Sequence, residues 1–351
     1  MKEKFPALAS YLAISAAAST SEDGNRCLIA PHPKVKKKIQ AELKRFKAMA
    51  RDTTFANTIT IHEPRRPGFN DGLIYPGAEL PLGTSLNVAR SIRLVKKPLR
   101  GVVRVIVVLV DFSDKPMKKS ISHFEDLFFS KGVVQTGSVR EYFQEVTNDL
   151  VDIQGQVVGP YRLPLTMKAY ANKSSGTGDE FPNARTMARD AVRLADPNVN
   201  FALYDNDKDG YVDAFVVIHA GTGAETNNNR HDIWSHKWVL QGQPYESDRG
   251  KRIYSYLTVP EDCKLGVCAH ELGHLLFGFP DLYDADYSSE GVGDWCLMGG
   301  GSWNNNGLTP AHPSSWCKCN QGWVDIKTPA TNRKNVSLDD VKKSNVVYKL
   351  W

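Results

Sequence analysis

Two histidines and a glutamate within one short stretch of sequence have the spacing of a catalytic zinc site. His270 and His274 are four residues apart, and Glu271 lies between them. In an α-helix, residues i and i+4 lie on the same face, so both imidazoles can bind one ion. The pattern predicts a hydrolytic centre in which Glu271 is the general base for a water molecule activated by zinc.

The residues around this motif can position it. Gly278 and Pro280 are expected to end the helix and turn the chain back, which brings the carboxylate of Asp281 near the ion. Further along, Met298 precedes three glycines, as in the methionine turn beneath the metal of one class of zinc peptidases. Apolar side chains would bury one face of the helix: Val267, Leu272, Leu275 and Leu276.

A catalytic zinc ion needs a third protein ligand and an open position. We expect Asp281 to be that ligand, with Asp284, Glu290 and Asp294 as alternatives, although an aspartate here can also simply form a turn. A thermolysin-type peptidase would use Glu290. Its ligand would project from a helix, which the following Gly291 disfavours.

A second group of carboxylates predicts a structural calcium site. Four aspartates alternate with other residues around Gly210: Asp205, Asp207, Asp209 and Asp213. Such a loop can wrap oxygen ligands about calcium. The twelfth position is Val216 instead of a glutamate, so the loop is not an EF-hand; an acidic surface turn is the alternative. Lone histidines nearby (His219, His231 and His236) are expected to be structural.

Composition indicates a globular protein without an integral membrane segment. The chain has 351 residues, of which 41% are hydrophobic and 24% charged. The net charge of +5 is local, because residues 34–52 contain eight Lys or Arg and two acidic residues, a charge of +6 that leaves −1 elsewhere. In this basic segment, Val35, Ile39, Leu43, Phe46 and Met49 have helical spacing. We expect an amphipathic helix that packs on the protein, not a nucleic-acid contact.

The rest of the chain predicts an α/β (α+β) fold with a mixed, twisted sheet. Residues 102–112 are almost continuously apolar, as in a central strand. Ser138 and Glu141 predict a capping box that opens a helix through Leu150. Residues 64–100, rich in Pro and Gly, are expected to form an extended strap. Further strands are predicted at 151–158 and 211–219, an edge strand at 253–259 and a helix at 182–194.

The compartment and the state of the cysteines stay open. Residues 5–18 resemble a signal peptide with a weakly apolar core, and two glycosylation sequons would be usable only in a secretory route. The sequence cannot give the pairing of six cysteines. Cys27 could block zinc through its thiolate, or it could form a disulfide or be a buried thiol.

Together these motifs resemble the immune inhibitor A family of zinc metallopeptidases, secreted endopeptidases related to the metzincins. The likeness covers about residues 102–323 and includes the aspartate loop, the zinc helix and the segment 298–303. It implies a zincin-like catalytic domain that acts on proteins, with His270, His274 and Asp281 as zinc ligands, Glu271 as base and Met298 beneath the metal. It also implies calcium. Asp281 lies seven residues after His274, one more than in the metzincin pattern.

The resemblance implies two regions. Residues 1–100 would hold a signal peptide and a pro-segment of a zymogen, whose removal up to about residue 98 raises activity. Residues 101–351 would form the catalytic domain. Family members commonly continue into a β-rich region, so either this sequence is truncated or the protein manages without that region. From another function class, the chain could be a catalytically idle binding domain, which the intact Glu271 disfavours. Oligomeric state and cleavage specificity cannot be read from the sequence.

Overall fold

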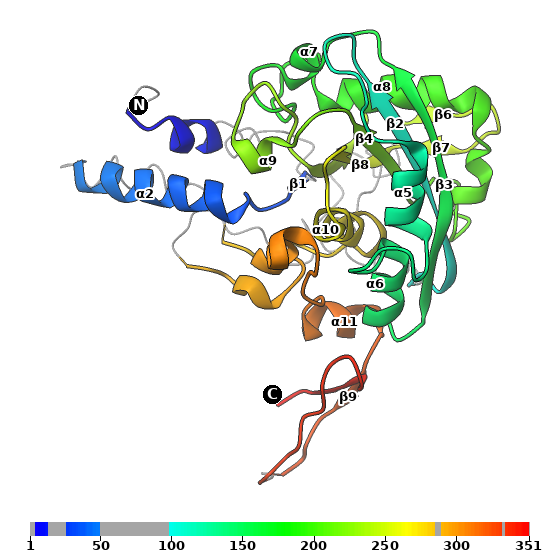
Figure 1. Ribbon diagram of the computed structural model, residues 1–351. Coiled ribbons are helices and arrows are strands. Elements are labelled where there is room, and N and C mark those ends of the chain that lie inside the picture. Colours follow the sequence, from blue (N-terminus) through cyan, green and yellow to red (C-terminus); the bar gives the residue numbers. More distant parts are fainter. Residues whose placement is uncertain (1–3, 13–25, 50–97, 285–288, 332–333, 351) are drawn as a thin grey trace, which may run out of the picture.

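The fold is organised around a six-stranded mixed sheet (Figure 1), in a computed structural model that describes residues 4–12, 26–49, 98–284, 289–331 and 334–350. The strand order is β1-β5-β8-β4-β2-β3. The four strands β8, β4, β2 and β3 run parallel. At one edge, β5 pairs antiparallel with β8, and β1 pairs antiparallel with β5. The bounds are β1 Cys27–Leu28, β2 Gly101–Asp111, β3 Val151–Arg162, β4 Phe215–His219, β5 His236–Val239 and β8 Ser255–Pro260.

The strand β2 is the centre of the core, as its apolar run predicts. Val105 and Val107 face one side of the sheet, Ile106 and Val108 face the other, and all four are fully buried. Because both faces are apolar, both must be covered. Helices α5 (Ile121–Phe129), α6 (Val139–Val146) and α10 (Leu265–Phe277) cover the first face, and α7 (Met167–Ala171) and α8 (Ala184–Ala195) cover the second (Figure 1).

Capping residues mark the start of two of these helices, α6 and α8. The capping box of Ser138 and Glu141 is present at the start of α6, and Tyr142, Phe143 and Val146 are buried as the spacing predicts. The helix ends at Val146, one turn earlier than expected. The helix α8 begins at Ala184, where Asn183 is the capping residue.

Two predictions about strands were wrong in part. Residues 253–259 do not form an edge strand, because β8 lies between β4 and β5 and its residues from Tyr256 to Pro260 are all buried. The buried strand expected from residue 211 begins only at Phe215, since the chain before it belongs to the aspartate loop. For β8, pairing with strands distant in sequence decided the outcome.

The basic N-terminal helix packs against the protein, as predicted. The helix α2 (Pro33–Met49) buries Val35, Ile39, Leu43 and Phe46. A short helix at residues 6–12 lies beside it, where the backbone N–H of Leu8 donates to Glu42 Oε2 at 2.8 Å. Residues 13–18 of the expected signal peptide and 64–97 of the expected strap lie outside the described residues.

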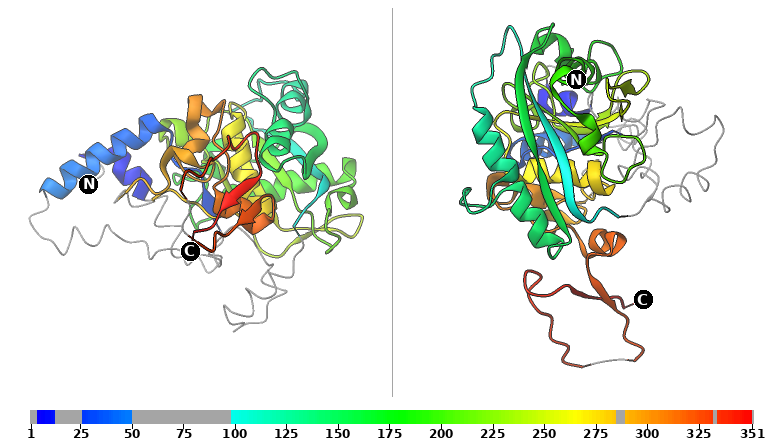
Figure 2. Two further views of the ribbon diagram at one scale, coloured as in Figure 1. Left: turned by 90° about the horizontal axis from the view of Figure 1, so that it is seen from below. Right: turned by 90° about the vertical axis from the view of Figure 1, so that its right-hand side faces the viewer.

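The remaining elements are short. Among the helices that the structure describes, none has the length and apolar character needed to cross a membrane. The parallel pair β9 and β10 projects from the rest of the chain (Figure 2, right). The remaining bounds are η1 Asp196–Asn198, η2 Phe201–Tyr204, α9 Ala224–Asn227, β6 Tyr245–Glu246, β7 Arg252–Ile253, η3 Gly293–Trp295, η4 Gly300–Gly307, α11 Ser315–Gln321, β9 Asp325–Lys327 and β10 Val346–Tyr348.

Candidate active site

The helix α10 brings the two predicted metal ligands together. It follows β8 directly and every residue from Leu265 to Phe277 is buried. His270 and His274 lie on one face with their Nε2 atoms 3.0 Å apart and their rings nearly perpendicular. Their Nε2 atoms can therefore reach one ion, as the i, i+4 spacing predicts.

Backbone carbonyls orient both rings. His270 Nδ1 lies 3.0 Å from the carbonyl oxygen of Leu297, and His274 Nδ1 is hydrogen-bonded to that of Phe279. A carbonyl oxygen only accepts, so each Nδ1 carries the proton and donates. Each Nε2 is then left with a lone pair, which is the state that binds a metal ion.

Asp281 joins the histidines because the chain reverses after α10. Gly278 ends the helix in the left-handed conformation, and the N–H of Phe279 donates to the carbonyl of Gly273 at 3.1 Å. This turn places Asp281 Oδ1 3.1 Å from His274 Nε2 and 3.2 Å from His270 Nε2. The side chain of Asp281 is only 6% exposed.

These three atoms fit a zinc ion. Tetrahedral ligands at normal zinc distances are about 3.3 Å apart, close to the separations of 3.0 to 3.2 Å found here. Burial lowers the pKa of His274, but Cys27 and Asp281 raise it well above the ordinary value. Burial raises the pKa of Asp281, but the histidines hold it far below its usual range. The same negative charge that favours a proton on His274 would favour a bound cation in its place.

Glu271 lies beside this group as a buried carboxylate. Its side chain is fully buried, and among the described residues neither of its oxygens has a hydrogen-bond partner. Burial raises the pKa of Glu271 well above its ordinary value, although His274 opposes the shift. A buried carboxyl group with a raised pKa and no hydrogen-bond partner is suited to exchange protons with a ligand that enters the site.

Met298 packs against the helix α10. It is fully buried, and a Cβ added to Gly273 would lie 3.0 Å from Met298 Sδ. A side chain at Gly273 would therefore have to displace the end of the Met298 side chain. The carbonyl of the same methionine accepts from the N–H of Leu282, next to Asp281. Thus the turn supports both the helix and the loop of the third candidate ligand.

The alternative third ligands lie elsewhere. Glu290 forms an ion pair with Lys36 of α2, and its side chain is 63% exposed. Asp284 accepts hydrogen bonds from the backbone and hydroxyl of Ser289. Asp294 is exposed. The structure brings together Asp281 and the two histidines and does not place the other three carboxylates with them.

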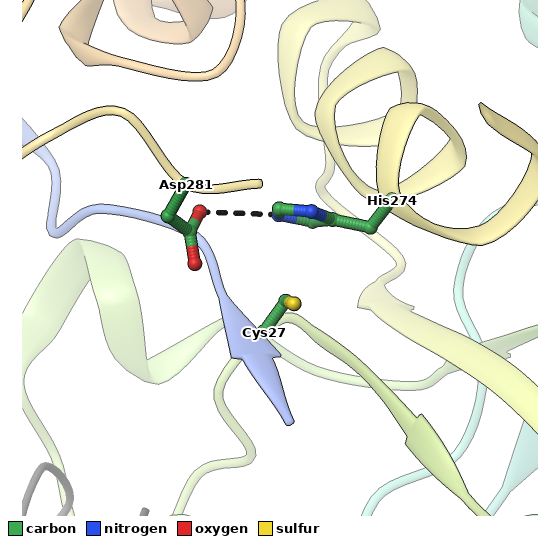
Figure 3. Close-up of side chains that lie close together, drawn as sticks. All are labelled: Cys27, His274 and Asp281. Carbon is green, nitrogen blue, oxygen red and sulfur yellow. Dashed lines mark hydrogen bonds and ion pairs between the residues drawn. The ribbon is translucent and has the colours of Figure 1, made fainter. Parts of the chain in front are cut away.

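Cys27 also points to this site, from a strand far away in sequence. All six cysteines are thiols. Cys27 is fully buried, and its sulfur, one His274 nitrogen and one Asp281 oxygen all lie within 4.8 Å of one another (Figure 3). Burial raises the pKa of Cys27, but His274 and Lys237 lower it by a larger amount. The pKa of the thiol is therefore below its ordinary value.

Two buried ionisable groups near the site had no signal in the sequence. Lys237 pairs with Cys27 across β5 and β1, and burial lowers its pKa to about 7. Glu225 accepts hydrogen bonds from the backbone and hydroxyl of Ser235, and burial raises its pKa to about 7. Neither belongs to a motif, so only tertiary contacts identify them.

The aspartate loop forms a second cluster. Ligand oxygens of Asp205, Asp207 and Asp209 lie within 4.8 Å of one another. Asp205 Oδ2 accepts from Lys251 Nζ at 2.6 Å, whereas Asp205 Oδ1 is buried without a hydrogen-bond partner among the described residues. Asp213 Oδ2 instead accepts from the backbone N–H of Asn206 at 2.6 Å.

The lone histidines have structural surroundings. His219 is buried with its Nδ1 near the Ala220 carbonyl, and burial lowers its pKa to about 4. His236 is buried between the Trp234 carbonyl and the Tyr256 hydroxyl. His231 is exposed.

Comparisons with known proteins identify the region that carries this site. Residues 97–329 match the family model described as immune inhibitor A peptidase M6, catalytic domain. The chain is 32% identical over 268 residues to the pre-pro-metalloprotease PrtV of Vibrio cholerae serotype O1, a match that covers 61% of this chain and 29% of that protein. It is 27% identical over 303 residues to immune inhibitor A of Bacillus thuringiensis subsp. alesti, covering 71% of this chain and 44% of the relative.

The chain thus spans less than half the length of these curated relatives. The family model covers about two thirds of the chain and includes the whole of α10, the loop to Asp281 and the methionine turn. These are the parts from which the site is built. The chain therefore belongs to the immune inhibitor A peptidase M6 family.

Proposed function

We propose that this chain is a zinc-dependent endopeptidase with a zincin-like catalytic domain. The observation that carries the proposal is the convergence of His270, His274 and Asp281 beside a buried Glu271 that has no hydrogen-bond partner among the described residues. Two imidazoles, one carboxylate and one neighbouring base are the parts that a hydrolytic zinc site requires. The family match and the metalloprotease relative give independent support.

In the proposed reaction, each residue has one task. His270, His274 and Asp281 would hold zinc, and the ion would supply a Lewis acid for the peptide carbonyl and lower the pKa of a water molecule towards ~7. Glu271 takes a proton from the attacking water and returns it to the leaving amine. The carbonyls of Leu297 and Phe279 keep both imidazoles in the tautomer that binds the ion. Burial of Glu271 raises its proton affinity, which suits a group that accepts a proton.

The test compares Glu271→Gln with the wild-type chain in a casein digestion assay, with zinc content measured for both. We expect the variant to keep its zinc and to lose a factor of about 10²–10⁴ in kcat, the usual contribution of a general base. Glu290→Gln is the matched control and keeps activity, because Glu290 pairs with Lys36 on the surface. Loss of zinc from the control would favour the thermolysin-type alternative. A wild-type chain with full zinc that stays inactive after residues 1–97 are removed would favour the idle binding domain.

We also propose that the protein is secreted and that residues 1–100 contain a pro-segment. The word pre-pro in the name of the Vibrio cholerae relative supports this assignment. So does the position of residues 26–28, which add strand β1 beside the metal site. Protein substrates are expected from the family description.

A structural calcium ion is the remaining part of the proposal. Three carboxylates converge in the loop of Asp205, Asp207 and Asp209, and the buried oxygen Asp205 Oδ1 has no hydrogen-bond partner within the described residues. Oxygen ligands on a tight loop suit calcium. The ion would stiffen the loop that leads into β4.

A further inference from the structure

The segment that carries Cys27 is held against the catalytic domain by several hydrogen bonds. The Trp234 and Trp303 indoles donate to the carbonyls of Ile29 and Ala30 at 2.9 and 2.8 Å. Tyr283 Oη donates to the carbonyl of Leu28 at 2.7 Å. Residues 28–30 are thus fixed from three parts of the domain, one of which lies two residues after Asp281. The thiol is therefore presented to the site by a fixed backbone.

The thiol lies close to two of the three candidate metal ligands. Cys27 Sγ, one nitrogen of His274 and one oxygen of Asp281 all lie within 4.8 Å of one another, and the last two residues are candidate zinc ligands (Figure 3). A tetrahedral zinc site accepts sulfur at about 2.3 Å alongside nitrogen and oxygen. The two histidines and Asp281 supply three ligands, so one position is left.

Buried ionisable groups surround this part of the site. Glu271 interacts electrostatically with Cys27 and His274, yet its oxygens have no hydrogen-bond partner among the described residues. Lys237 lies across from Cys27 in the β1–β5 pair and is itself buried.

We propose that the Cys27 thiolate is the fourth ligand of the metal and keeps the peptidase inactive while residues 26–30 remain in place. The inference rests on the proposed function, since it assigns a further ligand to the same ion. When the metal binds, the S–H bond breaks, the proton leaves to solvent, and a sulfur lone pair forms the bond to the ion. The attacking water needs that position, so hydrolysis cannot begin.

Release requires that β1 leave β5. The sulfur–metal bond then breaks, the sulfur regains a proton, and water can enter. The strand β1 pairs with β5 over only Cys27 and Leu28, so its departure disrupts a short ladder. It also exposes the backbone groups of β5, to which an extended peptide can add as a strand. One movement thus frees both the ion and a strand edge.

The experiment replaces zinc by cobalt(II) in the full-length chain and records its absorption spectrum. Thiolate ligation gives a charge-transfer band in the near ultraviolet, whereas visible d–d bands report tetrahedral coordination with or without sulfur. We expect both in the wild-type chain and only the d–d bands in Cys27→Ala and Cys27→Ser, with one cobalt bound in each. Cys263→Ala, which removes another buried thiol, keeps both. Activity of the Cys27 variants should rise about tenfold or more, the effect of losing about 1.4 kcal/mol of inhibition.

The outcomes separate the inference from the proposed function. A wild-type chain that binds one cobalt and shows d–d bands without the charge-transfer band overturns the role of Cys27 and leaves the peptidase site intact. A charge-transfer band that survives in both Cys27 variants does the same. A wild-type chain that binds no cobalt overturns both proposals. If the variants fail to fold, absence of the charge-transfer band from the wild-type spectrum still overturns the role of Cys27.

Discussion

The buried carboxyl group of Glu225 should make the stability of this protein depend on pH in a defined way. Its side chain is fully buried, and burial raises its pKa from 4.5 to about 7 against two hydrogen bonds from Ser235. A folded-state pKa above the unfolded value means that the folded protein holds the proton more tightly. The resulting stability is complete below about pH 4.5 and is lost as pH rises through 7.

The magnitude follows from the size of the shift. A rise from 4.5 to about 7, at about 1.4 kcal/mol for each pH unit, gives ~3 kcal/mol as the order of the effect. Glu225→Gln stays neutral at every pH and lacks this dependence. We therefore expect the unfolding free energy of the wild type, relative to that of the variant, to fall by ~3 kcal/mol between about pH 4.5 and pH 8.

Urea denaturation of both proteins in the same chelating buffers at several pH values measures this difference. Titration of the metal-site histidines occurs in both proteins and cancels in the comparison. Ser235→Ala provides a second arm, because the lost hydroxyl donor to Glu225 Oε1 raises the pKa further and moves the loss of stability to higher pH. A difference between wild type and Glu225→Gln that stays constant with pH would refute the reasoning.

Two further predictions concern the calcium loop and the N-terminal region. Calcium at 100 times its dissociation constant should stabilise the wild-type chain by about 2.7 kcal/mol and raise its melting temperature. The double variant Asp207→Asn, Asp209→Asn should show no shift in melting temperature. An equal shift in both proteins would argue against this site. A specific protease site inserted after residue 97 should leave activity low until it is cut, after which casein digestion rises; unchanged digestion after complete cleavage and removal of the N-terminal piece would exclude a pro-segment.

The parts of the site that the sequence predicts are those fixed by one helix. His270, Glu271 and His274 lie on α10, whose geometry depends on local hydrogen bonds and on a regular apolar pattern. The capping box at Ser138 is local in the same sense, and it is present in the structure. Such features require no knowledge of distant contacts. The amphipathic helix α2 was predicted for the same reason.

The third candidate ligand illustrates where local reasoning stops. Asp281 and Glu290 are both carboxylates downstream of the helix, and spacing alone left both open. What separates them is their position in the folded chain, because Glu290 is exposed and pairs with Lys36 of α2. Gly278 and the Phe279 carbonyl meanwhile direct the loop so that Asp281 meets the histidines.

Sequence reasoning predicted an edge strand at residues 253–259 wrongly and left the role of Cys27 open. Both results have one physical cause. Alternation in residues 253–259 suggested a half-exposed strand, but β5 and then β1 extend the sheet beyond β8. The strand β1 contains only two residues, too few to produce any periodic signal, and the hydrogen bond between Trp234 and Ile29 that helps to hold it joins residues 205 positions apart. A contact of so few residues and so great a separation leaves no pattern in the sequence. Yet these two residues complete the sheet edge and place a thiol at the candidate metal site. The strand β1 therefore depends on its tertiary surroundings and not on a local sequence pattern.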